Sequence, residues 1–118
     1  MNENAFQEAM RDATAAILND PAVKLFGGGR PDSRRAVDAY DVNCGLCEEW
    51  AEDVRRRYKA VTGQDDVEVL DPGNLTGDPN DSLSGHVFIR FMDRFYDAET
   101  PEGVTQWQHL PLFKKRCE

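Results

Sequence analysis

The sequence has few cysteines, no long hydrophobic run and too few basic residues to balance its acids. Three of the 118 residues are cysteine, an odd number that disfavours a disulfide framework and favours a reducing, cytoplasmic location. No segment approaches the roughly 18 apolar residues of a transmembrane helix, and the acidic N-terminus does not resemble a secretory signal. The net charge of -8 argues against nucleic acid or an anionic membrane as partner.

The composition that remains is that of one folded domain spanning residues 1–118. Apolar residues make up 40% of the chain and charged residues 31%, which is ordinary for a globular protein. Apolar spacing predicts an N-terminal helix over residues 3–19 and a core over 43–113. We therefore expect an α+β fold in which a central helix packs on a small antiparallel sheet that includes residues 86–97.

The central helix is predicted over about residues 46–61, and it begins beside a cysteine. One apolar side chain recurs every four residues along it: Leu46, Trp50, Val54 and Tyr58, with Ala51 and Val61 widening the stripe. Cys47 falls in the first turn, where outward backbone N–H groups and the helix dipole favour a thiolate. A nucleophilic cysteine also needs a base and a group that orients the base.

A hairpin later in the chain supplies both groups. Residues 86–91 and 94–97 read as strands joined by a two-residue turn at Met92 and Asp93. In that register Phe88 faces Asp97, and His86 lies on the same face two residues away. A slip of one residue would place His86 and Asp97 on opposite faces of the sheet.

Taken singly, each of the three residues has an ordinary structural explanation. Cys47 can be a small buried hydrophobe, His86 a strand-end residue bonded to backbone, and Asp97 a turn residue. Together, in the order thiol, imidazole and carboxylate, they form the set that a cysteine nucleophile requires. We therefore interpret Cys47 as nucleophile, His86 as base and Asp97 as the group that orients the imidazole.

Three short motifs carry a family resemblance. They are Gly45-x-Cys47-x-x-Trp50-Ala51, Gly85-His86-Val87-Phe88 and Phe95-Tyr96-Asp97-x-Glu99-Thr100. In this order the motifs resemble the core of transglutaminase-like cysteine proteins, which belong to the papain-like superfamily. The resemblance implies a papain-like fold and a Cys47, His86 and Asp97 triad. It also implies a peptidase, acyl transferase or deamidase activity, or an inactive binding module.

The favoured function is a cysteine hydrolase or acyl transferase acting on an amide, isopeptide or related acyl bond. Its expected partner is a protein or peptide, for which the acidic charge would suit a basic one, and no metal or organic cofactor is expected. The backbone N–H of Cys47 and the side-chain amide of Asn43 are the candidate oxyanion donors. A turn or capping role is the more common one for an asparagine placed like Asn43.

Other functions stay open. An acidic domain with the same core could be a catalytically inactive binding or inhibitor protein. Cys44 and Cys47 also form a C-x-x-C pair at a helix start, although no hydrophobic strand leads into it as a thioredoxin-like fold requires. A zinc site is the weaker reading because no second close pair of ligands is present. His109 is a rival base, placed in an irregular C-terminal segment.

Two loops complete the prediction. The glycines at 27–29 read as a plain linker, because no strand precedes them and no Lys-Ser or Lys-Thr follows, as a phosphate loop would require. Residues 71–85 read as a long polar loop, either a functional lid or a surface excursion.

Overall fold

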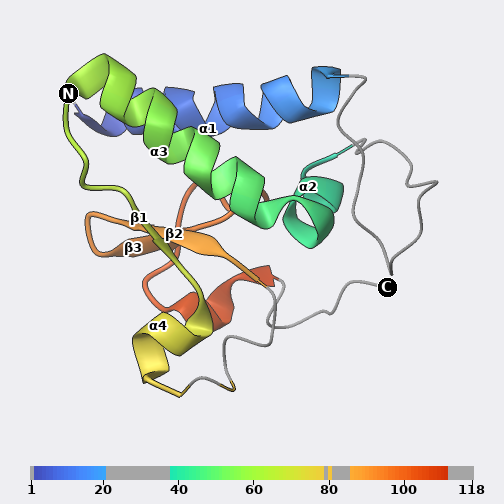
Figure 1. Cartoon of the computed structure of the whole chain (residues 1–118), viewed down its shortest axis with the longest axis vertical. Coiled ribbons are helices and arrows are strands. Elements are labelled where there is room, and N and C mark those ends of the chain that lie inside the picture. The colour runs from blue at the N-terminus through green and yellow to red at the C-terminus, as the bar shows by residue number, and fades with distance from the viewer. Residues whose placement is uncertain (1, 21–37, 79, 81–85, 112–118) are drawn as a thin grey trace.

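The computed structural model describes residues 2–20, 38–78, 80 and 86–111, and within them the chain is an α+β domain (Figure 1). This confirms the predicted class. The helices are α1 (Asn2–Asn19), α2 (Ala39–Gly45), α3 (Cys47–Thr62) and α4 (Pro72–Thr76). The strands are β1 (Glu68–Leu70), β2 (Phe88–Phe91) and β3 (Arg94–Tyr96), and a 3-10 turn, η2 (Trp107–His109), follows them.

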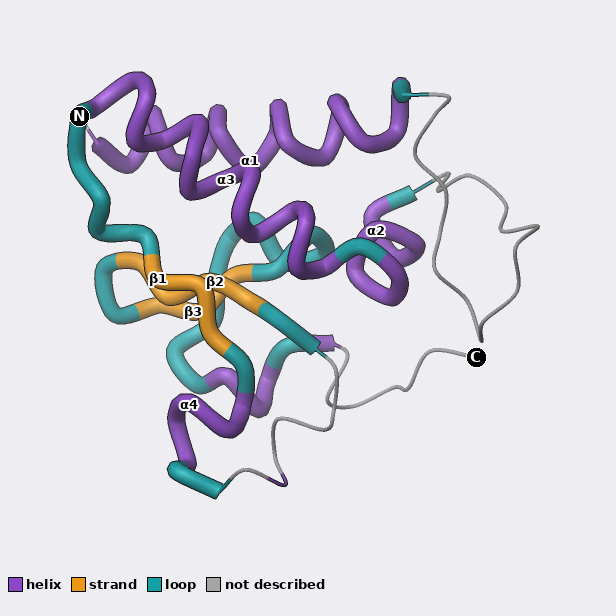
Figure 2. Tube along the Cα trace, in the orientation of Figure 1, coloured by secondary structure: helices purple, strands orange, loops and turns teal. Residues whose placement is uncertain are grey.

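The helices and the sheet form layers. The long helices α1 and α3 lie side by side over one face of the sheet, and α4 lies toward the other side (Figures 1 and 2). The strand order is β1-β2-β3 with antiparallel pairing throughout, Val69 opposite Ile89 and Ile89 opposite Tyr96. Beyond β3, Phe95 forms an isolated antiparallel bridge with Val104. The β2–β3 hairpin is therefore tied to the chain that follows it.

Aromatic side chains join the layers. Phe6 of α1 stacks on Phe91 of β2, with ring centroids 4.1 Å apart, and meets Tyr96 edge-on at 4.8 Å. Tyr58 of α3 meets Phe91 edge-on at 5.2 Å, so one ring of the sheet contacts both long helices. All four side chains are buried. Burial of such rings is the main favourable term that holds α1 and α3 on the sheet.

The central helix agrees with its sequence pattern except at one residue. It begins at Cys47, and Leu46, with φ −138°, breaks the backbone between α2 and α3. Leu46, Trp50, Val54 and Tyr58 are all buried, as their spacing predicts. Val61 is not; its side chain is 74% exposed, because it lies in the last turn of α3 where no described residue covers the apolar stripe.

The prediction of a structureless 71–85 loop is wrong for its first part. Residues 72–76 form α4, which begins with a capping box in which Asp71 accepts from the Asn74 backbone and Asn74 accepts from the Asp71 backbone. Pro72 occupies the first helical position, where its missing N–H costs nothing. Residues 79 and 81–85, and the predicted glycine linker at 27–29, lie outside the described residues.

Candidate functional site

The β2–β3 hairpin adopts the register that places His86 and Asp97 together. Residues Met92 and Asp93 form the two-residue turn with φ of 50° and 63°, the left-handed geometry of a type I′ hairpin. Ile89 pairs with Tyr96 and Phe91 with Arg94. Continuing that ladder by one step brings Phe88 opposite Asp97, as predicted.

His86 and Asp97 lie just past the paired residues, at the same end of the sheet. Nε2 of His86 is 3.5 Å from Oδ2 of Asp97. That separation is a charge contact at the long limit of a hydrogen bond, a common state of such pairs before substrate binds. Both side chains are buried, so the contact is screened little by solvent.

Cys47 reaches the same end of the sheet from the helical layer. It is the first residue of α3, and its Sγ accepts a hydrogen bond of 3.4 Å from the backbone N–H of Val87, the residue after His86. Figure 1 shows the start of α3 directly above the start of β2. The helix start and the strand start thus bring the thiol and the imidazole together from positions 39 residues apart in sequence, 86 minus 47.

The imidazole of His86 lies between a thiol and a carboxylate. Burial lowers its pKa, but hydrogen bonds with Asp97 and with Cys47, together with the charges of those two groups, outweigh burial and raise the pKa above 6.5. The protonated form of His86 is therefore stabilised by both neighbours. A proton-transfer group placed in this way has its pKa moved toward neutral pH, which suits a base.

The carboxylate of Asp97 is held ionised by several donors. Burial alone raises its pKa, but the polar groups of His86, Asn43 and Thr100 outweigh burial and lower the pKa below 3.8. The backbone N–H of Glu99 also donates to Oδ1 of Asp97 at 3.0 Å. With Oδ1 fixed in this way, Oδ2 is the oxygen directed to His86. Asp97 is therefore an anion with a set orientation.

Asn43 does not lie where a turn or cap residue lies, nor is its amide directed at the thiol. It belongs to α2, its side chain is 1% exposed, and Nδ2 donates to Oε1 of Glu99 at 3.1 Å. The same amide is one of the groups that lower the pKa of Asp97. Its Nδ2 is thus engaged by the Glu99 carboxylate, which disfavours the predicted oxyanion role.

All three candidate residues are covered. The exposed fractions are 9% for Cys47, 5% for His86 and 1% for Asp97. On one flank, Phe88 stacks on Trp107 of η2 at 6.3 Å, and the ring of His86 lies 5.9 Å from Phe88. Cys47 is therefore the most exposed of the three residues.

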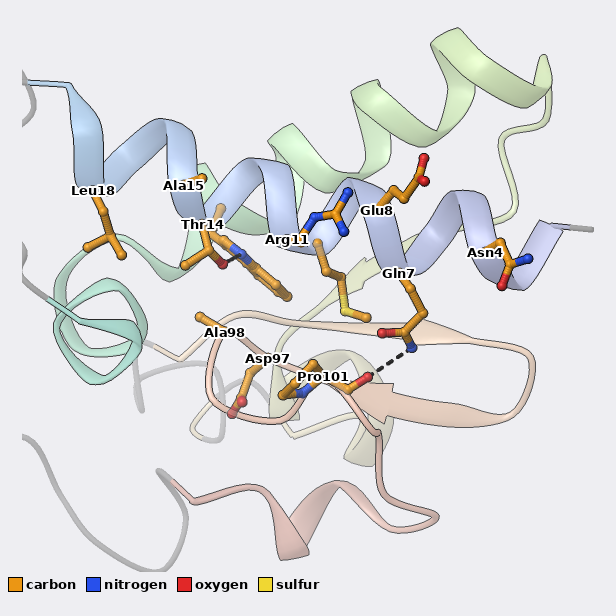
Figure 3. A pocket seen from close by; sticks show the side chains of 12 residues that line it. Asn4, Gln7, Glu8, Arg11, Thr14, Ala15, Leu18, Asp97, Ala98 and Pro101 are labelled. Carbon is orange, nitrogen blue, oxygen red and sulfur yellow. Dashed lines mark hydrogen bonds between the residues drawn. The ribbon is translucent and has the colours of Figure 1, made fainter.

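A groove lies behind this site, between α1 and the segment that follows β3. A space of about 680 Å³ separates α1 from the segment that follows β3, with apolar walls that include Met10, Trp50 and Pro101 (Figure 3). Asp97 contributes to its floor, but Figure 3 shows the carboxylate pointing away from α1. Cys47 and His86 do not line it. The groove therefore contacts the site only through the back of Asp97.

The structure gives little support to the alternative sites considered from the sequence. His109 lies in η2 and is exposed, away from the buried cluster. Among the described residues no group of three or more His, Cys, Asp or Glu side chains could hold a metal ion. The Arg55–Arg57 run is a paired surface, because Arg56 and Arg57 bind Asp53 and Arg55 binds Asp65. The side chain of Cys44 lies outside the described part of the chain.

Comparison with known proteins adds no family to this geometry. The chain matches no protein-family model, no curated protein and no solved structure at a significant level. Among the described helices, none has the length and apolar character needed to cross a membrane. The family resemblance noted in the sequence motifs therefore stays a prediction.

Two residues near Asp97 belong to the site although no role there was predicted for them from the sequence. Glu99 and Thr100 follow Asp97 in the third motif, and both contact the Asp97 network. The Asp-x-Glu-Thr spacing is the one available signal, because an Asp side chain often accepts from the backbone two residues on. The partner of Glu99, 56 residues earlier in the chain, has no sequence signal.

Proposed function

We propose that this chain is a papain-like cysteine hydrolase or acyl transferase that acts on an amide or related acyl bond of a protein or peptide. The observation that carries the proposal is the position of His86 between Cys47 and Asp97, each from a different segment of the chain. A cysteine nucleophile needs this relationship of thiol, base and orienting carboxylate. The helix-on-sheet arrangement agrees with the transglutaminase-like motifs.

The reaction begins with transfer of the Cys47 proton to His86. The thiolate attacks the carbonyl carbon of the substrate, and the carbonyl oxygen becomes an oxyanion. The C–N bond then breaks as the imidazolium returns the proton to the leaving nitrogen, which leaves a thioester on Sγ. Water, or an amine in a transferase, attacks the thioester, gives its proton to His86 and releases the thiolate.

Each group has a defined part in this scheme. Nε2 of His86 faces Asp97, so Nδ1 is the nitrogen that exchanges the proton with the thiol. Asp97 stays ionised, because its lowered pKa keeps it an anion at neutral pH, and it stabilises the imidazolium that forms. The backbone N–H of Cys47, at the start of α3, is the nearest oxyanion donor by position.

The proposal is tested by the pH dependence of iodoacetamide alkylation at Cys47, followed by mass spectrometry. Alkylation in the wild type is expected to continue well below the range, near pH 8.5, in which an ordinary thiol ionises. His86→Ala is expected to restore ordinary behaviour, because the thiolate loses its imidazolium partner. Cys44→Ser is expected to leave the profile unchanged.

The matched control is the same cysteine in urea-unfolded protein, which shows its reactivity without the fold. A native profile identical to the unfolded one would contradict the enzyme proposal. If Cys44→Ser abolished activity as completely as Cys47→Ser does, the C-x-x-C redox function would be favoured instead, because that chemistry needs both sulfurs.

One observation favours a second candidate function. The thiol is only 9% exposed, whereas three acids of the first turns of α3, Glu48, Glu49 and Glu52, face solvent. An inactive protein that binds a basic partner would use that acidic surface and keep the buried residues as core. Cys47→Ser separates the two functions, because a binder keeps its partner affinity and an enzyme loses turnover.

A further inference from the structure

One buried hydrogen bond connects the helix before the thiol to the segment after β3. Nδ2 of Asn43 donates to Oε1 of Glu99 at 3.1 Å, and Asn43 is 1% exposed. Asn43 lies in α2, four residues before Cys47, and Glu99 lies two residues after Asp97. This contact therefore joins the two segments that carry the nucleophile and the orienting carboxylate.

The amide nitrogen of Asn43 binds the Glu99 carboxylate directly. Nδ2 of Asn43 donates to Oε1 of Glu99, and the same amide is among the groups that lower the pKa of Asp97. Glu99 in turn donates its backbone N–H to Oδ1 of Asp97 at 3.0 Å. Asn43, Glu99 and Asp97 thus form a series of contacts in which Asn43 holds Glu99 and the Glu99 backbone holds Asp97.

Such a set leaves Asp97 one direction for its second oxygen. With Oδ1 held by the Glu99 backbone, and Glu99 held by the Asn43 amide, Oδ2 is turned toward Nε2 of His86. A carboxylate in a hydrogen-bonded network keeps its orientation without reorganisation when the neighbouring imidazole gains its proton. The geometry is that of a support for Asp97.

We infer that Asn43 is a positioning residue that holds Asp97 toward His86, with Glu99 as its fixed acceptor. This inference deepens the proposed function and rests on it for its catalytic meaning. This role takes the place of the predicted oxyanion role, because Nδ2 of Asn43 is directed to the Glu99 carboxylate. Its Oδ1 is buried, and the described residues supply no hydrogen-bond partner for it.

The test measures the titration of His86 directly, by NMR of protein labelled at histidine. The chain has two histidines, so exposed His109 serves as the internal reference. In Asn43→Ala the titration midpoint of His86 is expected to move toward acid by about one pH unit, because Asp97 is no longer held toward the ring.

Two variants at Glu99 provide the matched comparison. Glu99→Ala removes the acceptor and is expected to shift His86 in the same direction as Asn43→Ala. Glu99→Gln keeps an acceptor oxygen at the same reach and is expected to restore the wild-type midpoint. The Glu99 side chain is only half-buried, so these variants test the inference even where Asn43→Ala does not fold.

The outcomes separate this inference from its alternatives. A His86 midpoint that is unchanged in both Asn43→Ala and Glu99→Ala would overturn the positioning role. An unchanged midpoint with a slower single-turnover acylation in Asn43→Ala would instead assign Asn43 to the oxyanion hole. A shifted midpoint in a protein whose Cys47 alkylates like an ordinary thiol would uphold the network and refute the proposed function.

Discussion

Nε2 of His86 lies 3.5 Å from Oδ2 of Asp97, and both residues fall just outside the strands that bring them together. A residue inside a ladder has its side-chain direction fixed by the pleat, whereas a residue past its end can turn. The contact is possible because the hairpin register brings the two residues close together and the backbone outside the strands lets their side chains turn toward each other. Its energetic consequence is a stability that depends on pH.

Asp97→Asn should change that pH dependence. The raised pKa of His86 stabilises the fold at pH below 6.5 and this gain is lost as pH rises through the folded-state value. The lowered pKa of Asp97 stabilises the fold above pH 3.8 and this gain is lost as pH falls through its folded-state value. The pair therefore contributes most to the free energy of unfolding between these two pH values.

In Asp97→Asn the free energy of unfolding at pH 5 should fall by about 3 kcal/mol, because a protonated His86 loses its buried partner. The loss should be smaller at pH 8, where His86 is closer to neutral. Urea denaturation of both proteins at the two pH values measures the difference. Equal losses at pH 5 and pH 8 would show that the pair carries no charge interaction.

Gly103→Ala should be markedly destabilising. The backbone there has φ +76°, and an added Cβ would lie 2.6 Å from Cε2 of Tyr96, a distance at which one group must move. We expect a loss of about 2–3 kcal/mol from strain and overpacking together. Gly77→Ala is the matched control, because φ there is +78° but nothing lies within 4 Å.

The Gly77→Ala variant should lose only the cost of the left-handed backbone, about 1 kcal/mol. The difference between the two variants in chemical denaturation isolates the contact with Tyr96. Equal losses would mean that the Tyr96 ring moves aside without cost.

Thr14→Val should weaken the attachment of α1 to α3. Nε1 of buried Trp50 donates to Oγ1 of Thr14 at 2.9 Å, and valine keeps the shape of threonine but not the acceptor. A buried donor without its partner costs about 1–3 kcal/mol. Thr14→Ser retains the oxygen and should recover most of that loss, as measured by thermal unfolding. A Thr14→Val protein of wild-type stability would show that solvent satisfies the indole.

Replacing Met92-Asp93 by Asn-Gly should stabilise the hairpin. Both residues adopt positive φ, which asparagine and glycine accept more readily than methionine and aspartate do. Met92 is also 61% exposed, so its replacement removes little buried surface. We expect a gain of about 1 kcal/mol in the free energy of unfolding. Asp93→Val, which places a β-branched residue at φ +63°, should move stability in the opposite direction.

The helices and the hairpin register were accessible from local pattern. A four-residue apolar spacing predicted the buried stripe of α3, and strand parity predicted that Phe88 would face Asp97. Both are short-range regularities of backbone geometry. The helix α4 could also have been predicted locally, because Asp71-Pro72-x-Asn74 is a helix-start pattern. It was missed because residues 71–85 are polar and rich in loop-forming residues.

The supports of the candidate site were not accessible in this way. The Asn43–Glu99 hydrogen bond joins residues 56 positions apart, and its existence depends on how α2 is tilted against the segment after β3. The exposure of Val61 at the end of α3 also depends on tertiary structure. Val61 fits the apolar pattern, but no described element covers its side chain. The spacing of apolar residues predicts which face of a helix or strand is apolar, but it does not predict which other element packs against that face.

The contact between the Cys47 thiol and the Val87 backbone has a consequence for the life of a newly made chain. Synthesis delivers Cys47 first, and the hairpin segment that contains Val87 and ends at Asp97 is complete only about 50 residues later, at roughly 5–20 residues per second. Until that hairpin has packed against the start of α3, the Cys47 thiol lacks the Val87 N–H as a partner. The contact can therefore form only late in synthesis, when the central helix and the hairpin are both present.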